Sequence, residues 1–271
     1  MDVYYSYDFS NPQNFEKPDF NYNYKKHNQL NVNLAFVKLG YQSSRMRSNL
    51  ALMTGNYAMY NLSAEPNWAK PIFEANVGVK LLKDKDLWID AGVMPSHLGF
   101  ESAIGSDCWN LTRSILAENS PYFESGIKFN YTNKKQDVYV ALHILNGWQK
   151  IAITDDNQKP SIGIQLNYKP SSSLTLNYSN FLGNINAGGT NAFRTFHNLY
   201  AIYDASPKQA FIFGFDIGTQ KANNTQTAVW YTPVIISKIN LGTKSKIAAR
   251  LEYYNDKQQI IIPTQTPSGY Q

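Results

Sequence analysis

The chain contains many segments in which apolar and polar residues alternate. The links that join these segments are short and long in turn, and this order limits the folds that the chain can adopt. A β-meander that crosses an outer membrane has such an order because one rim carries short turns and the other carries larger loops. A soluble β-sandwich has no reason to keep it. Short polar turns fall near residues 43–45, 83–86, 133–136, 170–173, 206–208 and 242–244, and longer links fall near residues 9–26, 61–71, 95–120, 149–159, 184–191 and 221–226.

Apolar and polar side chains alternate within most of these segments, as they do in a strand that has one apolar face and one face in contact with water. The segments 73–81, 122–131, 211–218 and 247–253 show the pattern clearly. Segments 194–203 and 229–239 do not, because Asn198 lies among apolar residues and Pro233 interrupts apolar residues on both faces. We expect the apolar row to face lipid and the polar row to face water. In residues 122–131 the rows are Phe123, Ser125, Ile127, Phe129 and Tyr131, against Tyr122, Glu124, Gly126, Lys128 and Asn130.

The lengths of the segments suit membrane strands. Each has roughly 9 to 12 residues, about what a strand tilted near 45° needs to cross the hydrocarbon layer. Such strands must close into a barrel, because unpaired edges find no water in lipid. Single-chain bacterial barrels have an even number of strands, whereas this sequence offers about thirteen. It also starts in a strand without a signal peptide. We therefore predict an all-β, transmembrane, antiparallel up-and-down β-barrel as a single domain over residues 1–271, which lacks the signal peptide and about three closing strands of about sixteen.

Composition is compatible with this fold and excludes others. The absence of any stretch of about 18 apolar residues argues against helical membrane spans. Aromatic residues make up 14% of the chain, enough to supply girdles at the two membrane interfaces, although tyrosine also simply favours strands. The net charge is +5, but lysine and arginine are scattered singly, so no nucleic-acid partner is expected. The single cysteine, Cys108, excludes an internal disulfide framework and is expected to be buried.

The polar row supplies candidate pore-lining residues. Basic and acidic side chains are mixed along it, which predicts a pore of weak ion selectivity. An alternative with equal standing is that these charges form cross-strand ion pairs that stiffen the wall. The candidates are Glu74, Asn76, Lys80, Glu124, Lys128, Asn130, His143, Asp216, Lys246, Arg250 and Glu252.

The longest link, residues 95–120, contains a stretch with helical spacing. Trp109, Leu111, Ile115 and Leu116 are separated by polar residues, and Asp107 or Asn110 could cap a helix there. Long loops in barrels are usually functional or pack on themselves. We expect this loop to fold towards the barrel mouth and to form a constriction, whereas the alternative is a compact outer loop lying over the rim. The candidate constriction residues are Glu101, Asp107, Arg113 and Glu118.

Catalytic and metal-binding motifs are weak. The chain has no HExxH, CxxC or glycine-rich phosphate loop. Its histidines are far apart, and the pair His97 and Glu101 is too small a ligand set for a metal. We predict no catalytic residue, cofactor or metal site, and so no enzyme. A hydrolase built on the barrel wall is the weakest of the alternatives kept open.

Several runs of the sequence resemble the OmpL-like β-barrel porins of Bacteroidota outer membranes, and the similarity covers essentially the whole chain. The resemblance implies an outer-membrane barrel and no family catalytic motif. We predict a porin of a Gram-negative outer membrane that lets small hydrophilic solutes diffuse passively, with membrane lipid as a partner and a homo-oligomer left open. A plugged barrel with a structural or surface-binding role and a soluble all-β binding protein are the competitors. The runs are residues 2–12 (DVYYSYDFSNP), 49–57 (NLALMTGNY), 64–66 (AEP), 74–78 (EANVG), 94–105 (MPSHLGFESAIG), 117–122 (AENSPY), 145–148 (LNGW) and 214–218 (GFDIG).

Overall fold

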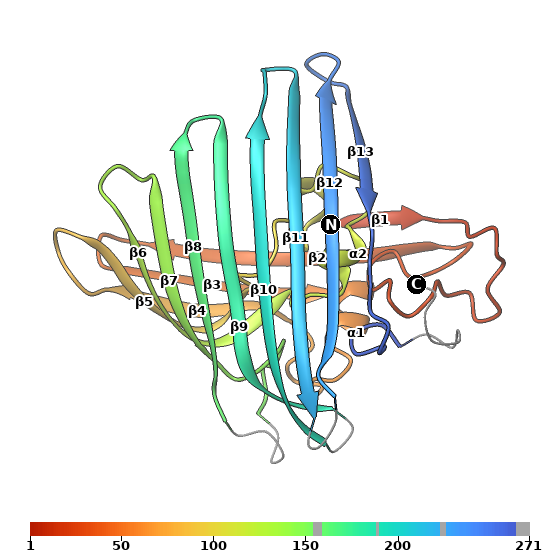
Figure 1. The fold of residues 1–271 in the computed structure, drawn as a ribbon, viewed down its shortest axis with the longest axis horizontal. Helices are drawn as coiled ribbons and strands as arrows, with labels where there is room; N and C mark the ends of the chain where they lie inside the picture. Colours follow the sequence, from red (N-terminus) through yellow and green to blue (C-terminus); the bar gives the residue numbers. More distant parts are fainter. Residues whose placement is uncertain (154–158, 188–189, 223–225, 264–271) are drawn as a thin grey trace.

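A computed structural model of the chain describes residues 1–153, 159–187, 190–222 and 226–263 (Figure 1). Within these residues thirteen strands form one sheet, and each strand pairs with its neighbours in sequence order, which confirms the predicted antiparallel meander. The strands are β1 (Asp2–Tyr5), β2 (Leu30–Gln42), β3 (Met46–Thr54), β4 (Ile72–Lys80), β5 (Asp86–Pro95), β6 (Phe123–Thr132), β7 (Val138–Leu145), β8 (Ser161–Ser171), β9 (Leu174–Ala187), β10 (Thr190–Asp204), β11 (Gln209–Ala222), β12 (Ala228–Asn240) and β13 (Lys246–Glu252). The helices described between the strands are short: α1 (Asn56–Asn61), η1 (Gly105–Asp107) and α2 (Ile115–Glu118).

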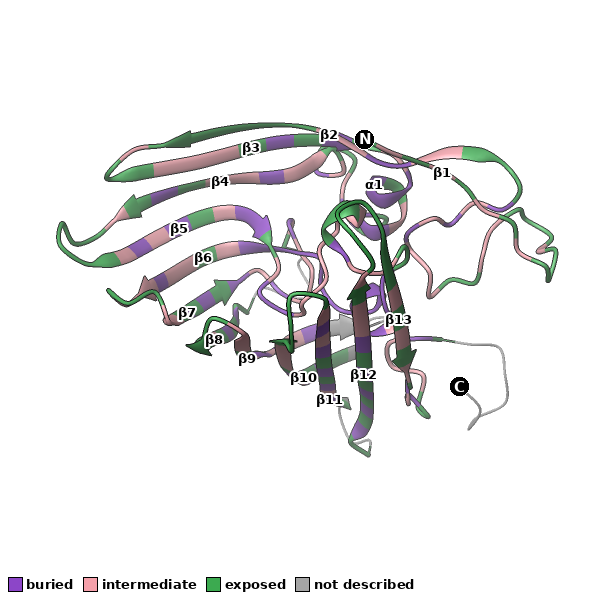
Figure 2. Ribbon diagram, turned by 90° about the horizontal axis from the view of Figure 1, so that it is seen from above, coloured by how far each residue is buried: buried purple, intermediate pink, exposed green. Residues whose placement is uncertain are grey.

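The sheet curls around a concave side. Seen from above, β2 to β4, then β5 to β9, then β10 to β13 follow a curve (Figure 2). Helix α2, in the segment between β5 and β6, packs on the inner side of this curve. The two edges are β1 and β13, which form no ladder with each other within the described residues. No described helix is both long and apolar enough to cross a membrane.

The alternation of short and long links holds for most of the chain but not for all of it. Short turns join β2 to β3 and the later strand pairs, whereas residues 55–71 and 96–122 form long links. The predicted long link at 184–191 is wrong, because β9 and β10 remain paired as far as Ala187 and Thr190. Parts of three predicted long links lie outside the described residues. They are residues 188–189 of this link, 154–158 of the link at 149–159 and 223–225 of the link at 221–226.

The apolar row of the strands is exposed on the convex side. Along β8, for example, Ile162, Ile164, Leu166 and Tyr168 are 42–47% exposed, whereas Ser161 and Gly163 on the other face are buried. In the described part of the chain all thirteen strands belong to a single sheet, so there the apolar row has no second sheet to pack against. A soluble sandwich with a dry core between two sheets is therefore excluded. An exposed apolar belt of this extent is what lipid would cover.

The two segments that the sequence left unassigned have clear faces in the structure. On β10, Asn198 is fully buried on the concave side and Leu199 is exposed on the convex side. On β12, Val234 and Ile236 face inwards while Ile235 faces outwards. The inner wall of β10 to β12 is thus rich in apolar residues. The sequence alone could not assign the faces of these strands because apolar residues occur on both, on one face towards lipid and on the other towards a loop.

Phe73 and Phe123 were expected on the lipid-facing row, and this is wrong. Phe123 is only 4% exposed and lies in a core cluster with Tyr57 of α1, against which Phe73 packs. The period-two pattern changes phase at this rim because the register of β3 and β4 shifts near Ala51 and because Gly126 at the start of β6 has φ 155°. The first residues of β4 and β6 therefore pack with the loops.

Candidate pore lining and inserted loop

A ladder of ion pairs crosses the concave face of β2 to β6. Lys38 Nζ lies 2.8 Å from the carboxylate of Glu74. The Arg47 guanidinium donates to both carboxylate oxygens of Asp90, at 2.6 and 2.5 Å. Each pair joins a basic side chain to an acidic side chain two strands away, so the pairs connect β2 to β4 and β3 to β5 across the strand between them.

The predicted lining residues of this region belong to the same ladder. Asn130 donates to Asp90 at 2.6 Å, and Lys128 Nζ lies 3.6 Å from the same carboxylate. Asn76 accepts a hydrogen bond from Asn49 at 3.0 Å, and Lys80 lies 3.9 Å from Asp86. The charges are therefore largely paired with opposite charges, as the stiffening alternative anticipated.

The remaining predicted lining residues on β11 and β13 contact other inner groups. Asp216 is 1% exposed and accepts a hydrogen bond from Asn198 at 2.5 Å. Glu252 accepts from Arg250 at 2.9 Å and from the backbone N–H of Ile115 at 2.7 Å. Arg250 also donates to the carbonyl of Thr112. Arg250 and Glu252 thus bind the loop that precedes α2, whereas Lys246 is exposed near the turn before β13.

Residues 96–122, which we call the inserted loop, lie against the concave face. Leu116 and Ala117 of α2 pack on an apolar patch of Ile212, Val234 and Ile236. At the start of the loop, the backbone N–H of Gly99 donates to Asn198 Oδ1 at 3.1 Å. The loop therefore spans the inner wall of β10 to β12 instead of lying wholly over the rim.

Two glycines on the inner wall make room for this loop. A Cβ at Gly163 would lie 2.6 Å from the ring of His97, and a Cβ at Gly214 would lie 2.5 Å from the ring of Phe100. Both distances are far shorter than van der Waals contact, so a larger residue at either position would displace the loop. Glycine inside a strand commonly marks such a close approach.

Three of the four predicted constriction residues brace the loop from within. Glu101 accepts hydrogen bonds from the N–H and the hydroxyl of Ser114. Arg113 donates to the carbonyl of Ala117 at 2.8 Å. Glu118 accepts from the backbone N–H groups of Tyr22 and Asn23, at 2.7 and 3.0 Å, and so ties the loop to the segment before β2. Asp107 is exposed at the end of η1.

Arg113 is buried against the ring of Tyr122, with its guanidinium carbon 3.7 Å from the ring centroid. Burial by itself lowers the pKa of Arg113, but Tyr122 and the carboxylates of Glu118 and Glu101 raise it above its ordinary value. The guanidinium therefore remains charged inside the loop, where a cation over an aromatic ring is favourable.

The predicted helix in this loop is shorter than expected. Only Ile115–Glu118 forms an α-helical turn, and Ser114 caps it by accepting from the N–H of Ala117. The proposed caps Asp107 and Asn110 are wrong, because Ser114 already satisfies that donor. Of the apolar residues in the pattern, Leu116 is 1% exposed but Leu111 is 87% exposed.

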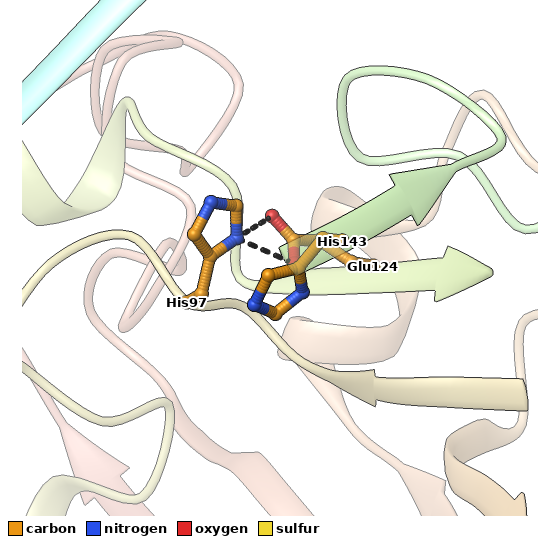
Figure 3. A group of neighbouring side chains, drawn as sticks. All are labelled: His97, Glu124 and His143. Atoms are coloured by element: carbon orange, nitrogen blue, oxygen red, sulfur yellow. Dashed lines mark hydrogen bonds and ion pairs between the residues drawn. The ribbon is translucent and has the colours of Figure 1, made fainter. Parts of the chain in front are cut away.

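Three buried side chains meet where the inserted loop leaves β5 (Figure 3). His97 Nδ1 lies 2.7 and 2.8 Å from the two carboxylate oxygens of Glu124 on β6, and its Nε2 lies 2.7 Å from the carbonyl of Asn180 on β9. The ring of His143 on β7 stacks on that of His97 at 4.1 Å. Among the described residues, His97, Glu124 and His143 form a group that could hold a metal ion.

Sequence reasoning missed this group because its members come from three segments. His97 was paired only with Glu101, four residues away, and Glu124 and His143 were assigned to the pore lining. A sequence signal existed in the polar row, where Glu124 and His143 occupy neighbouring predicted strands. Their partner His97 could not be identified from the sequence, because the path of the loop through the fold was not known.

A cavity of about 330 Å³ separates the inserted loop from the wall near β4 and β6. It is lined by apolar residues together with Glu74, Glu101, Arg113 and Ser96. The space between loop and wall is therefore not completely filled, and it carries charged groups of both signs.

A single membrane-type sheet with an exposed apolar convex face, a polar concave wall and a long loop packed inside defines a porin-like outer-membrane barrel. Comparison with known families agrees with this class. The chain belongs to the family described as "Putative beta-barrel porin-2, OmpL-like", whose sequence profile matches residues 1–271. It is an outer-membrane porin of a Gram-negative bacterium, and the resemblance to OmpL-like β-barrel porins is confirmed, whereas an origin in Bacteroidota stays a prediction.

Solved structures of outer-membrane proteins are similar to the chain, and the first of them shares its fold. The chain is similar to an anion-selective porin from Comamonas acidovorans at 11% identity and a TM-score of 0.57, over 84% of this chain and 72% of that one. The outer membrane channel DcaP of Acinetobacter baumannii matches at 7% identity and a TM-score of 0.45, over 85% and 81% of the two chains. OmpT of Vibrio cholerae, in a trimer form, matches at 9% identity and a TM-score of 0.45, over 84% and 81%. No curated protein sequence matches the chain.

Proposed function

We propose that small hydrophilic solutes diffuse passively between the charged wall of β2 to β6 and the inserted loop, and that the loop narrows this passage. The observation that carries the proposal is the asymmetry of the inner wall. The apolar patch around Ile236 is covered by the loop, whereas the charged side chains of the opposite wall remain partly exposed, with Lys38 at 40%. Water and polar solutes are therefore favoured along the charged side.

The proposed pore discriminates weakly between ions. The pairs Lys38 with Glu74 and Arg47 with Asp90 cancel most of the charge that a passing ion would meet. The wall thus resembles neither a ring of acidic nor a ring of basic side chains, which are the arrangements that give strong selectivity. Catalysis forms no part of this proposal, because the charged groups are engaged in structural pairs.

An assembly of identical subunits is a further part of the proposal. The exposed apolar row of β8 to β12 can pack against the same row of a second copy as well as against lipid. Cross-linking of the protein in native outer membranes should trap discrete oligomers. A single monomer band at every cross-linker concentration would contradict this part.

Conductance in planar bilayers tests the pore. The full-length protein should form discrete channels, and deletion of Gly99 to Ala117 should increase single-channel conductance because the narrowing segment is removed. Unchanged conductance after the deletion would refute the constriction. No channels in the intact protein, together with channels in the deletion variant, would instead favour the plugged barrel.

Reversal potential tests which face lines water. Lys128→Glu should shift the reversal potential in a salt gradient towards cation preference, because Lys128 is on the concave wall and 22% exposed. Lys134→Glu is the matched control, since it makes the same charge change in the exposed turn between β6 and β7. Equal shifts for the two variants would contradict the assignment of this wall to the pore.

A further inference from the structure

One of the two stacked histidines beside Glu124 has no hydrogen-bond partner. His143 is only 3% exposed, and both of its ring nitrogens are buried without a hydrogen-bond partner. Buried polar groups are normally satisfied, and an unpartnered one calls for a specific explanation. Figure 3 shows the ring of His143 beside the Glu124 carboxylate, where its Nδ1 lies 3.7 Å from Oε2.

We propose that His97, Glu124 and His143 bind a divalent transition-metal ion, of which Zn²⁺ is the best match, and that the ion fastens the inserted loop to the barrel wall. Two imidazoles and one carboxylate are a ligand set that zinc accepts readily, with a fourth position left for water. Calcium and magnesium prefer sets made of oxygen atoms alone. Imidazole ligands therefore point to the zinc class.

The geometry is close to that of a bound site. Ligand atoms around a tetrahedral zinc ion are about 3.4 Å apart, given bond lengths near 2.1 Å. The ligand atoms of the three residues all lie within 4.8 Å of one another. His97 and Glu124 now share a hydrogen bond of 2.7 Å, so the metal would replace that proton and push the two groups slightly apart. His143 needs only a side-chain rotation to turn a nitrogen towards the ion.

The surroundings support the ligands. His97 Nε2 contacts the carbonyl of Asn180 at 2.7 Å, and metal-binding histidines typically donate their second N–H to such a carbonyl. Ser96 donates to Glu124 Oε1 at 3.2 Å and so orients the carboxylate. Ser96 also lines the cavity beside the loop, which offers an ion a route to the site. The nearby cation Lys128 is paired with Asp90.

The position of the site gives the metal its role. His97 belongs to the inserted loop, whereas Glu124 and His143 belong to the adjacent wall strands β6 and β7. An ion shared by the three would cross-link loop and wall at the point where the loop leaves β5. The metal site does not depend on the proposed function, because it can be occupied whether or not the barrel conducts.

Calorimetric titration with Zn²⁺ tests the site in the full-length, folded protein in detergent, after treatment with a chelator. The wild-type protein should bind zinc stoichiometrically. His143→Phe keeps the ring stacked on His97 but removes both nitrogens, and it should weaken zinc affinity at least about tenfold. The matched control is His197→Gln, which removes a histidine of β10 that contacts Tyr178 and should leave affinity unchanged.

A second measurement keeps the test decisive if His143→Phe fails to fold. Co²⁺ added to the wild-type protein should give visible absorption bands typical of mixed nitrogen and oxygen ligands, and Zn²⁺ should remove them. Absence of stoichiometric zinc or cobalt binding to the wild-type protein would overturn the proposal. Equal zinc affinity in His143→Phe and His197→Gln would also overturn it, because zinc would then bind elsewhere.

Discussion

The packing of Leu116 gives the sharpest prediction about the inserted loop. Leu116 is 1% exposed and fits against Ile212, Val234 and Ile236, which are 4%, 2% and 0% exposed. Truncation of such a leucine to alanine removes buried methyl groups and leaves a cavity, at a cost of about 2 to 5 kcal/mol. The substitution weakens the contact between the loop and the wall by this free energy and leaves the sheet intact, because the strands keep their backbone pairing.

This cost can be measured as the frequency with which the loop detaches. Since about 1.4 kcal/mol corresponds to a factor of ten, Leu116→Ala should raise the population of the released loop at least about 30-fold. Arg113 lies in the same loop and is buried, so trypsin can cleave after it only when the loop opens. The rate of cleavage at Arg113, followed by mass spectrometry in detergent micelles, therefore reports the detached population.

The loop supplies its own control. Leu111→Ala makes the same chemical change five positions away, but Leu111 is 87% exposed, so cleavage at Arg113 should not change. Both variants must retain the intact barrel, which heat-dependent migration on gels can verify. Equal cleavage rates in Leu111→Ala and Leu116→Ala would refute the docking of the loop on β11 and β12.

Three further predictions concern the wall and the loop. Ile164→Lys, on the convex row, should destabilise the barrel in lipid by about 2 to 4 kcal/mol if the residue is at mid-depth, whereas Gln165→Lys should cost about 1 kcal/mol or less, as measured by urea unfolding in vesicles. Gly163→Ala should raise loop cleavage because its methyl group would strike His97, and unchanged cleavage would count against this contact. Burial raises the pKa of Cys108 to about 11. At pH 8, only about one thiol in a thousand is then reactive, so alkylation should be far slower than for an exposed cysteine, and an ordinary rate would contradict its burial.

The sequence predicted the sheet well because its information is local. Alternation along β8 and the polar turns between strands each depend on a few neighbouring residues, so they can be read without knowing the rest of the fold. The same rule failed at Phe123, where a shifted register and a glycine with positive φ change the phase of the row. It also left β12 unassigned, because Val234 faces a loop instead of water.

The candidate site could be predicted only in part. Lining residues such as Glu74 followed from the polar row, but their ion-pair partners required the register of neighbouring strands. The docking of the loop rests on contacts such as that between Ile115 and Glu252, which are 137 positions apart. One signal was available and was not used: Gly163 and Gly214 lie in inward positions of otherwise regular strands, where missing side chains indicate a close approach.

The porin architecture requires that the apolar row of each strand faces lipid. Spin labels placed singly at residues 164–168 of β8, in a Cys108→Ser background, test this directly in vesicles of the full-length protein. Labels at Ile164, Leu166 and Tyr168 should collide with oxygen dissolved in the bilayer, and labels at Gln165 and Asn167 should collide with a water-soluble nickel chelate. Accessibility that fails to alternate, or that alternates in the opposite phase, would contradict the porin architecture described above.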